Sequence, residues 1–369
     1  MDQKELIISF PKEGLRISAN DLAIRDITGD TLIIQKVATV CKWWYETDLP
    51  LHVSTSGSTG EPKKYYFQRA AIKTGIRMTT EALGLKQGMT ALLAIDPGFV
   101  GGRMMILRAL ENGMNLICTM PEGNPLENIS KAALIDFAAF VPIQIENILS
   151  NSETAEKFSR IARVIIGGAP ASERLRELLS EFPNRIYQTF GMTETLSHIA
   201  FKDLSDPQSS YVTLPGVEIS VDDRGCLVVD APGLLENRVV TNDLIRLKYK
   251  REFTWVGRID RLINSGGIKI SPELLETKCE LLSSRFSGIH KFIFHSQADE
   301  RLGQRVVLVI TGESDLSPEV IKELTENLKL VLEKYEMPKA IFRASGISLT
   351  PGGKTDFQAT LDSSCQIWP

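Results

Sequence analysis

The stretch Ser54-Thr-Ser-Gly-Ser-Thr-Gly-Glu-Pro-Lys-Lys64 gathers hydroxyl, glycine and lysine residues in one short run. Gly57 and Gly60 allow the backbone to turn its amide groups toward anionic oxygens, and the hydroxyl side chains add further donors. Lys63 adds a positive point charge. The spacing differs from the nucleoside-triphosphatase pattern, in which Gly-Lys-Ser/Thr follow in direct succession. The run therefore predicts a polyphosphate-binding loop, and an exposed Ser/Gly linker is the alternative.

The composition of the chain is that of an ordinary folded protein. It has 369 residues, of which 43% are hydrophobic and 24% are charged. This length predicts two domains. The formal net charge of -4 gives no electrostatic reason to expect a nucleic-acid partner, so we expect a small-molecule ligand.

Targeting signals and metal-binding patterns are not evident in the sequence. Residues 1–8 contain no long apolar core of a signal peptide, and no later segment reaches membrane-spanning length, which predicts a cytoplasmic protein without membrane insertion. The five cysteines are scattered, and the four histidines have no ligand spacing, so neither a disulfide framework nor a zinc site is expected.

Apolar runs alternate with helical patterns through the first half of the chain, which predicts an α/β layer architecture. The predicted strands here are 90–95, 115–119 and 163–166, and the predicted helices are 69–83, 103–111, 131–140 and 172–181. From Val217 onward, short alternating strands joined by Asp/Gly turns predict a smaller β-rich subdomain. A compact α+β unit follows from Arg261, with helices near 272–282 and 318–335 and strands at 291–295 and 305–311.

Two further runs follow predicted strands. Gly167-Gly168-Ala169-Pro170 lies between a strand and a helix, where open α/β sheets bind ligands, although a tight turn is the alternative. Tyr187 to Thr195 supplies an aromatic face for a purine, hydroxyl groups and the carboxylate of Glu194. That carboxylate would need a cation such as Mg²⁺ between phosphates.

Two charged residues further along the chain complete the pattern. Asp243 could accept hydrogen bonds from both ribose hydroxyls of a nucleotide. Lys354, on the flexible turn Pro351 to Lys354, could reach into a neighbouring site. Taken singly, each is more often a solvated surface residue. Their order with the other motifs favours a common site.

This combination resembles the adenylate-forming superfamily, which includes AMP-producing acyl-CoA synthetases, luciferases and peptide-synthetase adenylation domains. The loop at Ser54, the Gly-x-Thr-Glu motif at Gly191 and the Gly-Arg-x-Asp motif at Gly257 follow the order of that family, and the resemblance extends to Lys354. It implies an ATP- and acyl-binding domain at 1–259, shortened at its N-terminus, and a small mobile domain at 260–369.

The resemblance also implies a role for each matched residue, with ATP, Mg²⁺ and coenzyme A as cofactors. Nucleotide binding is assigned to Ser54, Thr55, Ser56, Gly57, Ser58, Thr59, Gly60, Gly168, Ala169, Tyr187, Gly191, Asp243 and Arg258. The catalytic residues are Lys63, Thr193, Glu194 as the magnesium ligand, and Lys354 as the adenylation lysine. Asp260 is the hinge, and Gly266 and Gly267 line the path of coenzyme A.

The implied chemistry has two steps. The substrate carboxylate attacks the α-phosphorus of ATP, pyrophosphate leaves, and Lys354 with Mg²⁺ offsets the growing charge. The small domain then rotates about Asp260 and admits the coenzyme A thiol, which releases AMP.

The segment from Phe99 to Gly113 resembles the acyl-pocket region of the o-succinylbenzoate-CoA ligase family of menaquinone biosynthesis. Members carry an arginine five residues before the matched glycine, and an arginine fork can recognise a second carboxylate. Arg108 is therefore the candidate substrate-binding residue, with Arg103 second and Gly102 also in the pocket. The alternative is that Arg108 is a helix-surface residue. His198, just after the Thr-Glu motif, could also touch the pocket.

Several departures from the family pattern keep other functions open. Phe99 replaces a frequent histidine, Asn242 a frequent glycine, and Thr355-Asp356 an apolar and a basic residue. The short region before Ser54 predicts a pocket that is more open or is completed by a second copy in a homo-oligomer. The alternatives are another aryl- or fatty-acyl-CoA ligase, a carrier-protein adenylation enzyme, or a nucleotide-binding regulator without turnover.

Overall fold

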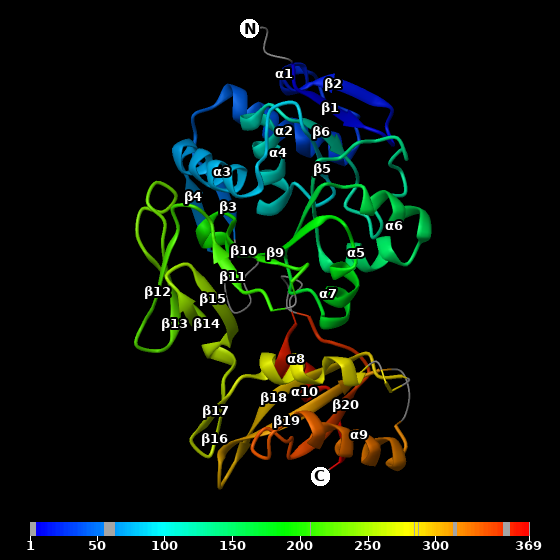
Figure 1. The fold of residues 1–369 in the computed structure, drawn as a ribbon, viewed down its shortest axis with the longest axis vertical. Coiled ribbons are helices and arrows are strands. Elements are labelled where there is room, and N and C mark those ends of the chain that lie inside the picture. Colours follow the sequence, from blue (N-terminus) through cyan, green and yellow to red (C-terminus); the bar gives the residue numbers. More distant parts are fainter. Residues whose placement is uncertain are drawn as a thin grey trace.

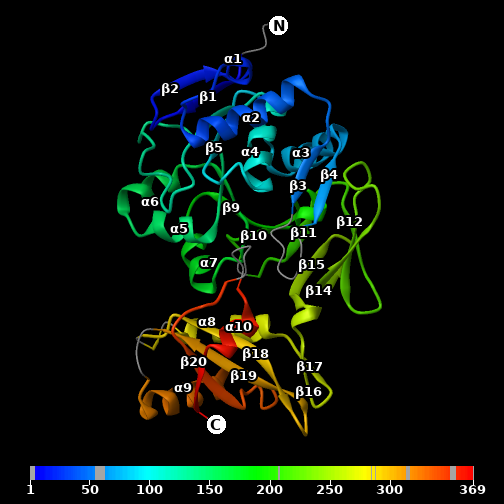
Figure 2. The ribbon, with the colours of Figure 1, turned by 180° about the vertical axis from the view of Figure 1, so that it is seen from behind.

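The computed structural model describes residues 5–54, 63–206, 208–283, 285–286, 288–312, 316–349 and 355–368. Its elements form two units that meet near residue 260, each built on its own large sheet (Figures 1 and 2). The helices of the first unit are α1 (Ala19–Ile24), α2 (Leu32–Glu46), α3 (Arg69–Leu83), α4 (Val100–Asn112), α5 (Pro142–Leu149), α6 (Ser152–Ser159), α7 (Glu173–Ser180) and the 3-10 turns η1 (Thr193–Thr195) and η2 (Ile259–Arg261).

The strands of the first unit form a mixed sheet and a separate hairpin. They are β1 (Ile7–Phe10), β2 (Leu15–Ser18), β3 (Leu51–Ser54), β4 (Lys64–Phe67), β5 (Thr90–Leu93), β6 (Asn115–Cys118), β7 (Phe137–Phe140), β8 (Arg163–Ile166), β9 (Arg185–Gly191), β10 (His198–Asp203), β11 (Tyr211–Thr213), β12 (Glu218–Val221), β13 (Cys226–Asp230), β14 (Val239–Tyr249) and β15 (Glu252–Arg258). The large sheet has the order β12-β13-β14-β15-β11-β10-β9-β8-β7-β5-β6-β1-β2, whereas β3 and β4 pair only with each other.

Helices cover both faces of the parallel part of this sheet, from β9 to β1. Successive side chains of a strand point to opposite faces. Leu93 accordingly joins a core with residues of α2, α3 and α4, while its neighbour Leu92 joins a second core with residues of α5, α6 and α7. The predicted α/β layering is confirmed.

Residues 131–140 form no helix, so this part of the prediction is wrong. Residues 131–136 are turns and irregular backbone, and 137–140 form β7. All four side chains of β7 are buried because it lies between β5 and β8 with a core on each face. Such a strand is a short apolar run without alternation, which periodicity alone cannot distinguish from a buried helix.

The second unit has its own sheet, which contains both antiparallel and parallel strand pairs. Its elements are β16 (Ile263–Ser265), β17 (Ile268–Ile270), α8 (Pro272–Ser283), β18 (Lys291–Asp299), β19 (Gly303–Thr311), α9 (Pro318–Val331), β20 (Ala340–Ala344), α10 (Phe357–Asp362) and β21 (Cys365–Trp368). Side chains of α8 and α9 pack on one face of the sheet and Leu361 of α10 on the other. The predicted division at 259/260 falls between the last strand of the first sheet and the first strand of the second.

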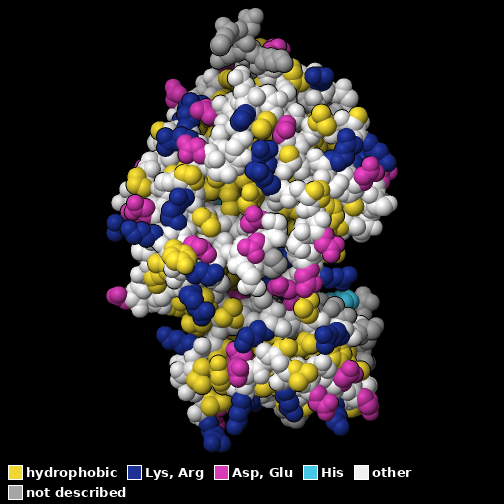
Figure 3. Space-filling model, viewed as in Figure 1, with side chains coloured by type: hydrophobic (Ala, Val, Ile, Leu, Met, Phe, Trp, Pro, Cys, Tyr) yellow, Lys and Arg dark blue, Asp and Glu magenta, His cyan; other side chains and the backbone are white. Residues whose placement is uncertain are grey.

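The junction between the units carries both signs of charge, since acidic and basic side chains lie along it in the space-filling view (Figure 3). A direct contact is made there by Glu280 of α8, whose Oε2 accepts from the backbone N–H of Glu173 at the start of α7, at 2.9 Å. None of the helices in the described part of the chain combines the length and apolarity needed to cross a bilayer.

Candidate functional site

The turn from Gly191 to His198, between β9 and β10, is packed so closely that it requires glycine at its start. A Cβ atom at Gly191 would lie 2.3 Å from the Ser197 carbonyl oxygen and 2.4 Å from the His198 Cα. Leu196 is fully buried with a φ of 60°, a costly conformation for leucine that is often found at functional turns. The shape of the turn that presents Glu194 is therefore determined by its packing.

Glu194 lies within hydrogen-bonding distance of the hairpin that bears the predicted phosphate loop. The Tyr65 hydroxyl donates to Glu194 Oε1 at 3.1 Å. Strands β3 and β4 pair with Ser54 opposite Lys64, which brings the two ends of the loop together. Burial, and then the nearby Glu194 carboxylate, raise the pKa of Tyr65, so the phenol remains a donor at neutral pH. The predicted loop residues 55–62 lie outside the described part of the chain.

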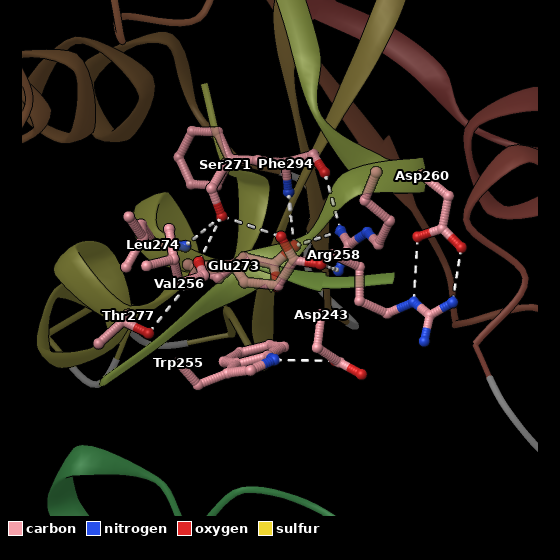
Figure 4. A network of polar contacts seen from close by, with 12 residues as sticks. Asp243, Trp255, Val256, Arg258, Asp260, Ser271, Glu273, Leu274, Thr277 and Phe294 are labelled. Atoms are coloured by element: carbon pink, nitrogen blue, oxygen red, sulfur yellow. Dashed lines mark hydrogen bonds and ion pairs between the residues drawn. The ribbon is translucent and has the colours of Figure 1, made fainter. Parts of the chain in front are cut away.

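The predicted ribose-binding residues are cross-strand neighbours, because Asp243 of β14 pairs in register with Arg258 of β15. Trp255 Nε1 donates to Asp243 Oδ1 at 2.9 Å (Figure 4). Burial is the main cause that raises the pKa of Asp243, and the carboxylates of Asp260 and Glu194 add to the shift.

Arg258 directs its guanidinium to the predicted hinge residue. Its Nε and Nη2 donate to Asp260 Oδ1 and Oδ2 at 3.0 and 2.6 Å (Figure 4). This bidentate pair is the largest cause that lowers the pKa of Asp260. Both side chains are partly exposed, so the pair contributes little to stability, about 0–1 kcal/mol.

The second unit closes against the end of β15. A Cβ atom at Gly257 would lie 2.5 Å from Ser271 Oγ and 2.7 Å from Glu273 Oε2, so the start of α8 requires glycine at this position. Ser271 Oγ also donates to the Val256 carbonyl at 2.9 Å. Arg261, just after the hinge, pairs with Glu273 at 3.2 Å. The chain on either side of Asp260 is therefore held to α8.

The predicted adenine-binding residues lie on and beside the adjacent parallel strands β8 and β9. Gln188, buried in β9, donates from Nε2 to the Ala169 carbonyl at 3.1 Å and so holds the loop after β8. Gly168 in that loop has a φ of 83°, which favours glycine. The Tyr187 ring is half-buried and stacks on Phe201 with the ring centroids 5.6 Å apart.

Arg108 is fully buried in α4, so the alternative of a helix-surface residue is wrong. The residue is 2% exposed, its Nη2 donates to Ser197 Oγ at 2.9 Å, and its Nε has no hydrogen-bond partner among the described residues. Burial lowers the pKa of the guanidinium to about 9. No ion pair found in the described part of the chain includes Arg108. A buried cation of this kind is costly unless an anion accompanies it.

A chain of polar groups extends from Arg108 through residues that sequence analysis largely missed. His198 Nε2 lies 2.9 Å from Thr79 Oγ1, and the Thr79 hydroxyl donates to the Gly75 carbonyl at 3.1 Å. Arg108 Nη2, which can only donate, lies 3.5 Å from the same Nε2, and the Ser197 hydroxyl lies 3.4 Å from His198 Nδ1. Burial, with Arg108, lowers the pKa of His198 well below its ordinary value, so the ring is neutral. The position of His198 after the Thr-Glu motif was the only sequence signal.

Two other residues predicted for the acyl pocket have structural contacts. Arg103 Nε donates to the Pro97 carbonyl at 3.1 Å and its Nη1 donates to the His52 carbonyl at 2.7 Å, which ties α4 to the β3–β4 hairpin. A Cβ atom at Gly102 would lie 2.4 Å from the Asp96 carbonyl oxygen, so packing alone accounts for this glycine. Neither contact tests a role in substrate binding.

Two lysines and two glycines are also among the predicted site residues. Lys354 lies outside the described residues, and Lys63 is exposed next to the predicted loop. Gly266 and Gly267, with φ of 60° and 86°, form the two-residue turn between β16 and β17, and Gly266 N donates to the Leu302 carbonyl at 2.9 Å. The assignment of this turn to coenzyme A stays a prediction.

The donor set around Glu194 fits a magnesium ion only together with phosphate oxygens. Within the described ranges, no three carboxylate, histidine or cysteine side chains gather to hold a metal by themselves. Mg²⁺ is commonly bound by one or two carboxylates, with substrate phosphates and waters as the other ligands. Since Tyr65 occupies Oε1 of Glu194, the carboxylate retains Oε2 as a ligand oxygen.

Comparison with known proteins assigns the family. The model of the family described as AMP-binding enzyme matches residues 35–236. A solved structure of an acyl-CoA synthetase (AMP-forming)/AMP-acid ligase II-like protein from Dyadobacter fermentans is 33% identical, covers 94% of this chain and 98% of its own, and has a TM-score of 0.62. The chain belongs to the AMP-binding enzyme family.

More distant relatives have names that specify a substrate. The 2-succinylbenzoate–CoA ligase of Staphylococcus aureus strain MSSA476 is 26% identical over 83% of this chain, which spans 65% of the length of that relative. The o-succinylbenzoate CoA synthetase from Bacillus subtilis, solved with its acyl-adenylate intermediate, is 19% identical with a TM-score of 0.70, over 83% of this chain and 68% of its own. The predicted adenylate-forming fold is confirmed.

Proposed function

We propose that this protein is an AMP-forming acid–thiol ligase. It would activate a carboxylic acid with ATP to an acyl-adenylate and pyrophosphate, and then transfer the acyl group to coenzyme A with release of AMP. The observation that carries the proposal is the hydrogen bond from Tyr65, on the hairpin of the phosphate-loop motif, to Glu194, in a chain of the AMP-binding enzyme family whose Asp243 and Arg258 are cross-strand neighbours.

Each of the site residues would have a role that suits the chemistry of its side chain. Asp243 would accept from the ribose hydroxyls, with Arg258 beside it, because a carboxylate is a pure acceptor and a guanidinium a pure donor. A magnesium ion held by Glu194 and the phosphates would supply charge neutralisation at the α-phosphorus. Lys354 would bring a further cation, and Asp260 would be the pivot of the unit that carries it.

The acid is proposed to be o-succinylbenzoate, as in menaquinone biosynthesis. Arg108 supports this choice, since it is a buried guanidinium without an acidic partner in the described chain, close to the turn that bears Glu194. An aromatic acid with a second carboxylate would provide that anion. Relatives from Staphylococcus aureus carry the corresponding name.

The direct test mixes the protein with ATP, Mg²⁺, coenzyme A and the candidate acid, and measures pyrophosphate, AMP and thioester. All three products should appear with o-succinylbenzoate and not without it. Activity with only a monocarboxylic aryl or fatty acid would support the ligase function but exclude o-succinylbenzoate as the substrate. Tight ATP binding without pyrophosphate release for any acid would instead favour a regulator without turnover.

ATP–pyrophosphate exchange tests the adenylation lysine. Lys354→Ala should suppress exchange by at least about 100-fold while ATP binding stays within a few-fold, because the lysine would act mainly in the transition state. Equal exchange in the variant and the wild type would mean that another group supplies the charge.

A further inference from the structure

Tyr65 is a polar link between the hairpin of the phosphate-loop motif and the turn that presents Glu194. The two-stranded hairpin lies outside the large sheet. Tyr65 is the second residue of β4, opposite Val53 of β3, and its half-buried ring packs against the larger core of the first unit. Its hydroxyl then reaches Glu194 Oε1 at 3.1 Å. The ring is thus anchored, and the oxygen is aimed at one carboxylate.

The neighbouring residues of the strand point elsewhere. Side chains alternate along β4, so Lys64 and Tyr66 are exposed, and Tyr66 is 64% exposed with its ring 5.3 Å from that of His52. Two tyrosines therefore lie side by side in one strand, and of these only Tyr65 contacts Glu194 in the described structure. This difference makes Tyr66 a matched control.

We propose that Tyr65 is a positioning residue that holds Oε1 of Glu194, so that Oε2 is presented to the magnesium ion of a bound magnesium–nucleotide complex. The inference rests on the proposed function. A free glutamate side chain must lose rotamer freedom when it binds a metal, and a fixed hydrogen bond to one oxygen removes part of that loss beforehand.

The alternative is that Tyr65 only fills space between the hairpin and the core. The two interpretations separate cleanly, because Tyr65→Phe keeps the ring and removes the hydrogen bond alone. Glu194 would then keep its charge and its place in the turn, but its carboxylate would be free to rotate.

The test measures metal and nucleotide binding rather than turnover. Binding of Mn²⁺ with ATP is followed by the electron paramagnetic resonance signal of the free ion, and ATP binding is followed by calorimetry over a range of Mg²⁺ concentrations. We expect Tyr65→Phe to weaken metal binding in the ternary complex about tenfold, with recovery of ATP binding at saturating Mg²⁺. Tyr66→Phe should differ from the wild type by less than twofold.

A double variant adds a readout that a packing role would not give. If Tyr65 acts through Glu194, the loss in Tyr65→Phe/Glu194→Gln should be no greater than in Glu194→Gln alone. Additive losses would overturn the proposal, as would metal binding in Tyr65→Phe equal to that of the wild type. Wild-type ATP binding that is independent of metal would instead overturn the role of Glu194, and the role of Tyr65 with it.

Discussion

Arg258 and Asp260 form a bidentate ion pair where the first sheet ends and the second unit begins. One partner is the proposed ribose contact and the other is the proposed hinge. A nucleotide that engages Arg258 must share this guanidinium with Asp260 or displace it. If Arg258 contacts the ribose as proposed, nucleotide binding and the position of the second unit are linked through this one side chain.

Arg258→Lys tests that link, because lysine keeps the charge but cannot make the bidentate contact. We expect unfolding stability to change by less than about 1 kcal/mol, since the pair is partly exposed. ATP affinity should fall by about tenfold, and ATP should no longer alter proteolytic cleavage near residue 260. Arg238→Lys, which alters an exposed ion pair with Asp230 just before β14, is the control. Unchanged ATP affinity in Arg258→Lys would contradict the role at the ribose.

Arg108→Leu should separate substrate recognition from folding. Replacing a buried charge with an apolar group is often neutral or stabilising, so the melting temperature should hold or rise. The kcat/KM for o-succinylbenzoate should fall at least about 100-fold, while that for a monocarboxylic analogue should change by less than about threefold. Steady-state kinetics with both acids measure the difference.

Arg103→Leu is the matched control on the same helix. Because Arg103 donates to two backbone carbonyls, this change should lower stability and affect both acids alike. Equal losses for the two acids in Arg108→Leu would remove the proposed dicarboxylate selectivity.

Asp243→Asn should have opposite effects on stability and on binding. Burial raises the pKa of Asp243, so the folded protein binds its proton more tightly than the unfolded chain. Protonation of Asp243 therefore adds to the free energy of unfolding below the ordinary carboxyl pKa. This stabilisation is lost as the pH rises through the raised pKa of Asp243 in the folded protein. At neutral pH the variant should therefore unfold at a higher temperature.

The nucleotide affinity of Asp243→Asn should fall by about tenfold or more, because the ionised acceptor is lost. In the wild type, ATP affinity should increase as pH rises through the raised pKa of Asp243, and this increase should be absent in the variant. Calorimetry from pH 4.5 to about 7 measures both. The same pH profile in the two proteins would assign the titration to another group.

Gly191→Ala should destabilise the first unit. The added methyl would overlap the Ser197 carbonyl and the His198 Cα, and overpacking of this kind costs about 1–3 kcal/mol or more. For a domain of this size we expect the melting temperature to fall by about 3–10 °C. Gly75→Ala in α3 is the control, since its Cβ meets only ordinary contacts and should not destabilise. An unchanged melting temperature in Gly191→Ala would mean that the turn can relax.

The motifs of the proposed nucleotide site are evident in the sequence, because each is a short local run. Gly191, for example, owes its place to a close approach of Ser197 and His198 in the same turn, and a requirement of this kind is visible in the local sequence. Helix α3 was predicted with its bounds because a regular amphipathic pattern and a following glycine specify it.

Other features were decided only by tertiary structure. Residues 137–140 were expected to be helical because burial on both faces erases the strand alternation. The burial of Arg108 and its polar chain through His198 to Thr79 depend on α3, α4 and the turn after β9, which are distant in sequence. The contact of Tyr65 with Glu194 joins positions far apart along the chain. The sequence by itself determines which residues carry groups suited to binding a nucleotide. Only the packing of distant segments determines that Tyr65 contacts the carboxylate of Glu194.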